Sequence, residues 1–264
     1  MTGDLPNAVR IVRIGPHTLI LGDAYAVLPG LLAARGRPFD EAVMDPPYDF
    51  DNSGGGAFRA ARHAADAVVD LGLDRGFDHS ILTPALADGV VVFCHNDQLP
   101  EILTQVKRQF ARFALCLWRK TNPMPVANKH YQPDGEFYVH AWLKPAHPVG
   151  ELSAKKRVWD GPVARGGEGA HPTVKPDGLM AKIMANLSGG EVIDPFMGTG
   201  STGVAAVRVG KTFTGIERHP HWFDLAVRRV TAAMDGAPDP IRERPRIRPA
   251  VDAPAPLFAG EGAG

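Results

Sequence analysis

One stretch near the C-terminal end limits the range of folds more than any other, the segment from Glu191 to Gly203 (EVIDPFMGTGSTG). A short apolar run ends in Asp194, a Gly-x-Gly turn follows, and an Ala/Val-rich run with helical spacing comes next. Glycines let the backbone turn sharply and approach a ligand closely. The start of the following helix offers unpaired N–H groups and the positive end of a dipole. The segment therefore predicts a strand, a tight loop and a helix that together hold a nucleotide-like cofactor.

The rest of the chain repeats this alternation. Apolar runs predict seven strands, at residues 18–22, 41–44, 89–94, 114–118, 136–143, 191–194 and 211–216. Helical spacing is found at residues 24–34, 100–113, 176–187, after Gly203, at 223–234 and, in pieces, at 59–86. Such alternation is typical of a doubly wound α/β fold with a mainly parallel sheet. We expect one domain over residues 1–235, followed by a disordered Pro/Arg/Ala-rich tail at 236–264.

Composition narrows the class of protein further. Lys plus Arg equals Asp plus Glu at 29 each, so any nucleic-acid contact must come from a local basic patch. Cys94 and Cys116 lie in apolar runs and are expected to be buried, reduced thiols. The sequence contains no apolar stretch of about 18 residues and no signal-like N-terminus. These features predict a soluble cytoplasmic protein, with no membrane contact and no metal site.

Acidic residues close four of the predicted strands: Asp23, Asp45, Asp194 and Glu217. In doubly wound sheets, ligands bind beyond the carboxyl ends of the strands. We therefore expect these four acids to gather on one rim. The formal Gly-x-Gly-x-x-Gly pattern, with Glu217 downstream to hold a ribose, leaves open an NAD-dependent oxidoreductase.

A second motif, Asp45-Pro46-Pro47-Tyr48, favours different chemistry. The exocyclic amine of a nucleobase is a poor nucleophile because its lone pair is delocalised into the ring. Two acceptors aimed at its N–H groups favour a more tetrahedral nitrogen, and the Asp45 carboxylate and the proline-fixed Pro46 carbonyl supply them. The Tyr48 ring offers a face on which a flipped base can stack.

Together these motifs resemble the amino-methylating DNA methyltransferases that use S-adenosylmethionine. The resemblance covers roughly residues 15–234 and includes His171-Pro172-Thr173-Val174-Lys175-Pro176 just before the glycine loop. The tetrapeptide precedes the cofactor loop, an order that resembles the permuted β class. It implies a Rossmann-like class I methyltransferase fold, with seven strands in circularly permuted order and small recognition insertions.

The resemblance also implies a role for each matched residue. Asp45, Pro46, Pro47 and Tyr48 are the implied catalytic group. The implied S-adenosylmethionine site comprises Asp23 near the adenine, Glu217 on the ribose, and His171, Thr173, Lys175, Asp194, Phe196, Gly198, Thr199, Gly200, Ser201 and Thr202.

Adenine N6 is the implied target, because Asp-led tetrapeptides in this family mostly accompany adenine, with cytosine N4 as the alternative. A DNA-binding module without catalysis is a more distant one. Target recognition is expected in residues 49–88 and 144–169, and duplex DNA is the expected partner. Candidate contacts to DNA are Arg119, Lys120, Lys129, Lys155, Lys156, Arg157 and Arg165. The sequence leaves both a monomer and a homodimer open.

Overall fold

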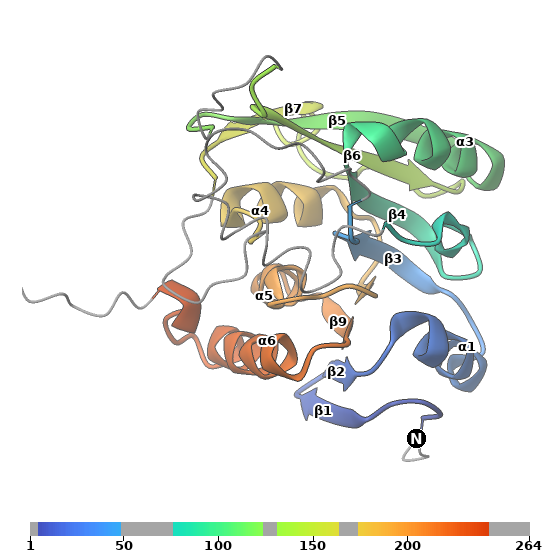
Figure 1. Ribbon diagram of the computed structural model, residues 1–264, viewed down its shortest axis with the longest axis vertical. Helices are drawn as coiled ribbons and strands as arrows, with labels where there is room; N and C mark the ends of the chain where they lie inside the picture. Colours follow the sequence, from blue (N-terminus) through green and yellow to red (C-terminus); the bar gives the residue numbers. More distant parts are fainter. Residues whose placement is uncertain (1–4, 49–75, 124–130, 164–173, 243–264) are drawn as a thin grey trace, which may run out of the picture.

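The computed structural model describes residues 5–48, 76–123, 131–163 and 174–242. They contain a nine-stranded sheet with the order β1-β2-β9-β8-β3-β4-β6-β5-β7 (Figure 1). The strands are β1 (Arg10–Ile14), β2 (His17–Leu21), β3 (Phe39–Met44), β4 (Ala87–Cys94), β5 (Arg112–Lys120), β6 (Gly135–Trp142), β7 (Val158–Gly161), β8 (Glu191–Asp194) and β9 (Thr212–Glu217). The α-helices of the described ranges are α1 (Ala24–Arg35), α3 (Leu99–Gln109), α4 (Asp177–Asn186), α5 (Ser201–Arg208) and α6 (Pro220–Met234), with short 3₁₀ turns η2 (His79–Ile81), η3 (Asn96–Gln98) and η4 (Pro240–Arg242).

The sheet is mixed, with nine strands instead of the predicted seven. Strands β2, β9, β8, β3 and β4 form a parallel block, but β1–β2, β4–β6 and β6–β5 are antiparallel pairs. Apolar runs locate strands without giving their direction. Parallel neighbours need a crossover of about a dozen residues or more, usually a helix, whereas antiparallel neighbours can be joined by a short turn, and the strand runs alone do not distinguish the two.

The two additional strands lie at the edges of the sheet. Strand β1 is largely exposed, so it lacks the continuous apolar run that marks a strand buried on both faces. Strand β7 has four residues and falls within the predicted recognition segment 144–169. Its pairing with β5 shows that part of that segment belongs to the framework. Residues 164–169 of that segment lie outside the described residues.

Two predicted boundaries were wrong. Helix α3 ends at Gln109 instead of Phe113, because Phe110 is extended and Arg112 already pairs with Trp142 of β6. The predicted tail also begins too early. Residues 236–242 are part of the packed structure, with Asp239 buried and η4 following it. The remainder, from residue 243, lies outside the described residues.

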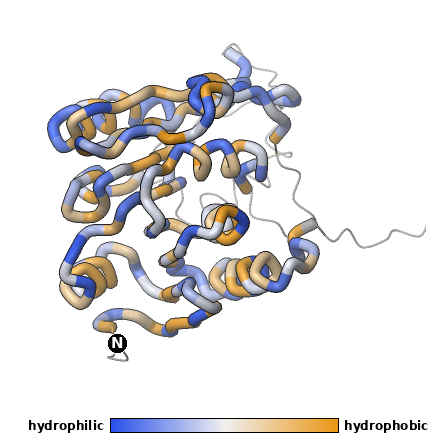
Figure 2. The backbone as a smooth tube through the Cα atoms, turned by 180° about the vertical axis from the view of Figure 1, so that it is seen from behind, coloured by the Kyte–Doolittle hydropathy of each residue, from blue (hydrophilic) through white to orange (hydrophobic). Residues whose placement is uncertain are grey.

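Alternate residues of the central strands face two different cores, as expected for strands covered on both sides. Leu19 and Leu21 of β2 pack in the core under α4, α5 and α6, whereas Ile20 packs in the core under α1 and α3. Figure 1 shows these two helical layers on opposite faces of the sheet, and Figure 2 shows hydrophobic and hydrophilic bands alternating along the chain. Cys94 and Cys116 are buried and free, as predicted.

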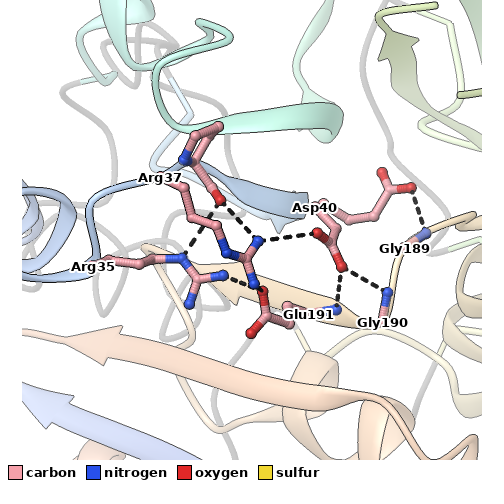
Figure 3. A network of polar contacts seen from close by, with 8 residues as sticks. Arg35, Arg37, Asp40, Gly189, Gly190 and Glu191 are labelled. Atoms are coloured by element: carbon pink, nitrogen blue, oxygen red, sulfur yellow. Dashed lines mark hydrogen bonds and ion pairs between the residues drawn. The ribbon is translucent and has the colours of Figure 1, made fainter. Parts of the chain in front are cut away.

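The amino ends of β3 and β8 are joined by a polar network (Figure 3). Arg35 and Arg37 both pair with Glu191 at the start of β8. Asp40 of β3 accepts hydrogen bonds from the backbone N–H groups of Gly190 (2.9 Å) and Glu191 (3.0 Å). These contacts hold the amino ends of β3 and β8 side by side. The carboxyl ends of the two strands take no part in them and remain available to a ligand. Within the described ranges, no helix is long and apolar enough to cross a membrane.

Candidate active site

A cavity of about 340 Å³ lies beyond the carboxyl ends of the parallel strands. Its volume is within the range of small-molecule sites. The acids that follow or close four strands, Asp23, Asp45, Asp194 and Glu217, all line it. The predicted gathering of acids on one rim is therefore confirmed, because parallel strands bring their carboxyl ends to the same edge.

The glycine-rich loop between β8 and α5 forms one wall of the cavity. Gly198 and Gly200 have left-handed backbone conformations, with φ of 51° and 82°. The backbone N–H of Gly198 donates to a Glu217 oxygen at 2.9 Å. Gly200 does not line the cavity, because it faces helix α6, where an added Cβ would meet the Cβ of Ala226 at 3.0 Å. Its glycine is required for close helix packing and a positive φ.

Asp194 and Glu217 hold the glycine-rich loop by accepting hydrogen bonds from its backbone. Asp194 is 2% exposed and accepts a hydrogen bond from the backbone N–H of Phe196 at 3.0 Å. Burial raises the pKa of Asp194 to about 7. Glu217 accepts from the backbone N–H groups of Gly198 and His219 (2.7 Å), and burial raises its pKa as well. Both carboxylates thus shape the backbone and border the cavity.

Aromatic rings cover the cavity near Asp23. Phe196 lies 6.1 Å from Tyr25 and 6.0 Å from Phe77, measured between ring centroids. The Tyr25 hydroxyl accepts a hydrogen bond from the backbone N–H of Asp78 at 2.9 Å, which fixes Phe77 beside the cavity. Asp23 caps helix α1 by accepting from the Ala26 N–H at 3.1 Å. Tyr25 and Phe77 were not predicted, because a tyrosine and a phenylalanine at helix and loop positions resemble ordinary packing residues.

The tetrapeptide 45–48 follows β3 and lines the same cavity. The Tyr48 hydroxyl lies 2.9 Å from Asp45 Oδ1, and the Lys175 ammonium donates to Asp45 Oδ2 at 2.6 Å. The Gln98 side-chain amide donates to the Pro47 carbonyl at 3.1 Å and holds the proline backbone. Burial is the largest effect on Asp45 and raises its pKa, while the Lys175 ammonium opposes that rise.

Glu136, the second residue of β6, is a further site residue that sequence reasoning missed. Its Oε1 lies 2.8 Å from Lys175 Nζ and 3.0 Å from the Tyr48 hydroxyl, and its Oε2 pairs with Lys120 at 2.9 Å. Burial opposes ionisation, but Lys175 and Lys120 together hold the pKa of Glu136 down at about 2. In the sequence, this role was indicated by no more than a single acid at the start of a strand rich in aromatic residues.

The basic residues predicted to contact DNA have different environments. Arg119 makes two 2.8 Å hydrogen bonds to the carboxylate of Asp160 across the β5–β7 pair, and Lys120 is paired with Glu136. Lys155, Lys156 and Arg157 are exposed in the turn before β7. Four predicted site residues lie outside the described residues: Lys129, Arg165, His171 and Thr173. The same holds for 49–75, most of the first predicted recognition segment.

A family model for DNA methylases of the N6/N4 type matches residues 40–228. The chain belongs to this family. It is 29% identical over 244 residues to the type II methyltransferase M2.LlaDCHI of Lactococcus lactis subsp. cremoris, across 80% of this chain and 88% of the relative. It is 30% identical over 135 residues to the type II methyltransferase M2.DpnII of Streptococcus pneumoniae, across 44% of this chain and about half (49%) of that relative.

Solved structures show the same fold. The structure of the M1.HpyAVI–SAM complex superposes with a TM-score of 0.59 at 22% identity, across 80% of this chain and 98% of that one. The class I methyltransferase fold expected from the sequence is therefore confirmed, apart from the strand count and direction. S-adenosylmethionine is the methyl donor of the N6/N4 family, as predicted. Membership in this family shows that the oxidoreductase alternative was wrong.

Proposed function

We propose that this N6/N4 DNA methylase transfers a methyl group from S-adenosylmethionine to the exocyclic N6 of adenine in duplex DNA. One observation carries the proposal: Asp45-Pro46-Pro47-Tyr48 and the glycine-rich loop line one cavity, although about 150 residues separate them in the sequence. A methyl donor and a flipped base can therefore meet there. The target base has to leave the helix, because its amine cannot be reached inside a stacked duplex.

The composition of the cavity fits this cofactor. Among the described residues, four carboxyl groups line it, against the two cationic side chains Lys175 and Arg218. S-adenosylmethionine carries a positive sulfonium centre, whereas the pyrophosphate of a dinucleotide would meet excess negative charge. We assign the adenine to the aromatic wall of Tyr25, Phe77 and Phe196. The ribose hydroxyls are assigned to Glu217, whose oxygens can each accept more than one hydrogen bond.

Catalysis in this proposal depends on positioning and electrostatics. When bound, S-adenosylmethionine supplies an electrophilic methyl carbon. Asp45 and the Pro46 carbonyl accept the two N–H bonds of the target amine and free its lone pair, and Tyr48 stacks against the base. The Asp45 carboxylate also stabilises the positive charge that develops on the nitrogen and is placed to accept the released proton.

The choice of base rests on the Asp-led tetrapeptide, because the family includes both N6 and N4 methylases. Cytosine N4 is therefore the second candidate. Purified protein, methyl-labelled cofactor and duplex DNA should yield labelled N6-methyladenine after enzymatic digestion. N4-methylcytosine as the labelled product would overturn the base assignment, and unlabelled DNA over a range of target sequences would overturn the activity.

Duplex DNA enters the proposal as the substrate, with the exposed turn of Lys155, Lys156 and Arg157 as a candidate phosphate contact. Contacts to phosphates release counterions, so binding through this turn should weaken as salt rises. The type II relatives suggest that the protein acts in a restriction–modification system. The proposal also includes the permuted β-class order of the motifs and a single catalytic domain that extends at least to residue 242.

The raised pKa of Asp194 predicts a pH-dependent cofactor affinity. A cation bound beside Asp194 favours its ionised form, so binding releases a proton wherever the free carboxyl is protonated. With a pKa of about 7 in the free protein, affinity should increase roughly tenfold between pH 6 and pH 8. Calorimetry at several pH values measures this rise.

The matched variant Asp194→Asn should lack that rise. The comparison removes any contribution from the ligand's own amine, because its titration is common to both proteins. Equal pH dependence in the two proteins would show that Asp194 does not titrate on cofactor binding.

A further inference from the structure

A chain of alternating charges lies behind the proposed catalytic acid. Lys120 pairs with Glu136, Glu136 pairs with Lys175, and Lys175 pairs with Asp45, with separations of 2.9, 2.8 and 2.6 Å. The Lys175 side chain is 6% exposed and that of Glu136 13%. Buried charges persist when each is paired and hydrogen-bonded. The network therefore fixes both carboxylates with their compensating ammonium groups.

Lys175 uses its donors within this network. An ammonium has three N–H bonds. In the described part of the chain, three acceptors lie near Nζ: Asp45 Oδ2 at 2.6 Å, Glu136 Oε1 at 2.8 Å and the Tyr48 hydroxyl at 3.4 Å. None of its donors is left for a cofactor carboxylate. The cofactor contact that the sequence resemblance implied for Lys175 thus competes with the pairing found here.

Tyr48 connects the two carboxylates. Its hydroxyl lies 2.9 Å from Asp45 Oδ1 and 3.0 Å from Glu136 Oε1. A phenol has one proton, so it can donate to one of these two oxygens at a time. A target amine that takes Asp45 Oδ1 displaces the Tyr48 hydroxyl, and Glu136 is the neighbouring acceptor to which that hydroxyl can then donate its hydrogen bond.

We infer that Lys175 and Glu136 are positioning residues for Asp45. Lys175 holds Oδ2 and keeps the carboxylate ionised and oriented, so that Oδ1 is presented to the target amine. Glu136 holds Lys175 in place and accepts the Tyr48 hydrogen bond when the amine arrives. This role rests on the proposed function, because it assigns Asp45 as the acceptor for a substrate N–H group.

The charges around Asp45 give the two positioning residues opposite effects on its titration. Removing the Lys175 charge leaves Asp45 facing Glu136 and should raise the pKa of Asp45. Removing the Glu136 charge leaves two ammonium groups and should lower it. Asp45 is surrounded by other titratable groups from several elements of the described structure. These are Tyr48 beside the acid, His95 beside the Tyr48 ring, Cys94 on β4, Glu136 on β6, Lys120 on β5, Lys175 before α4 and Asp194 on β8.

The test is the pH profile of single-turnover methyl transfer for Lys175→Met and Glu136→Gln. Each variant should react about 100-fold more slowly than wild type, with cofactor affinity changed less than threefold. The acidic limb of the profile should move to higher pH in Lys175→Met and to lower pH in Glu136→Gln. Lys175→Arg keeps the charge and should keep the limb near its wild-type position. Residues that merely support the fold would not produce shifts of opposite sign.

A second measurement does not depend on turnover. Carboxyl ¹³C NMR of aspartate-labelled protein follows the titration of Asp45, whose signal is assigned by its absence in Asp45→Asn. The midpoint should rise in Lys175→Met and fall in Glu136→Gln, even if the wild type methylates no DNA. Shifts in the same direction, unchanged midpoints, or a loss of cofactor affinity at a normal methylation rate would overturn the inference.

Discussion

Replacing Asp45 with alanine should lower the rate of methyl transfer about 1,000-fold while cofactor affinity changes only a few-fold. The carboxylate is the one charged acceptor of the tetrapeptide, and among the described residues its Oδ1 accepts a hydrogen bond from the exchangeable Tyr48 hydroxyl alone. The cofactor loop is held by other residues, Glu217 and Asp194, so it should keep its shape. Single-turnover kinetics and calorimetry with S-adenosylmethionine measure the two quantities.

The matched control is Asp88→Ala, which removes an exposed acid from β4. Surface substitutions of this kind change stability by less than about 0.5 kcal/mol. The control should therefore react at the wild-type rate. If Asp45→Ala lost cofactor binding but kept its rate at saturating cofactor, Asp45 would belong to the cofactor site and not to the catalytic group.

Arg229→Met should destabilise the fold by about 3–5 kcal/mol, the cost of leaving a buried charge without its partner. Arg229 of α6 is 1% exposed, and its guanidinium makes hydrogen bonds of 2.9–3.2 Å to the carboxylate of Asp239. It also donates to the Thr199 carbonyl at 2.8 Å and to the Ser201 hydroxyl at 3.3 Å. Urea unfolding should show a lower midpoint, and cofactor affinity should fall because the loop loses this support.

Two comparisons separate this effect from a simple loss of positive charge. Arg228→Met removes a neighbouring exposed arginine of α6 and should leave the unfolding midpoint unchanged. The double variant Arg229→Met with Asp239→Asn should recover part of the lost stability, since no unpaired buried charge remains. A midpoint for Arg229→Met equal to that of Arg228→Met would contradict a structural role for the buried pair.

The sequence predicted the elements whose side chains are buried on both faces. Strands β3, β4 and β8 contain uninterrupted apolar runs (residues 42–44, 90–94 and 192–193), and their place in the central parallel block explains why. Edge strands β1 and β7 carry no such run, because solvent covers one side of them. The direction of each strand could not be predicted either, because an apolar run is the same whether the neighbouring strand is parallel or antiparallel.

The site was predictable where its residues follow strands of one parallel sheet. Asp23, Asp45, Asp194 and Glu217 meet for that topological reason alone. Glu136 was not predictable, because its approach depends on the antiparallel pairing of β6 with β4. The partnership of Arg229 with Asp239 lay beyond periodicity as well, since it joins a helix to a segment that composition marked as a tail.

The proposed mechanism brings a methyl donor and a flipped adenine together in one cavity, with Asp45 as the acceptor for the adenine amine. Its most direct test is single-molecule sequencing of genomic DNA from a host that lacks adenine methylation and expresses this protein. We expect N6-methyladenine at a fixed short target sequence with the wild type and none with Asp45→Ala. Unmodified DNA with well-expressed wild type, or the same modification with Asp45→Ala, would contradict this mechanism.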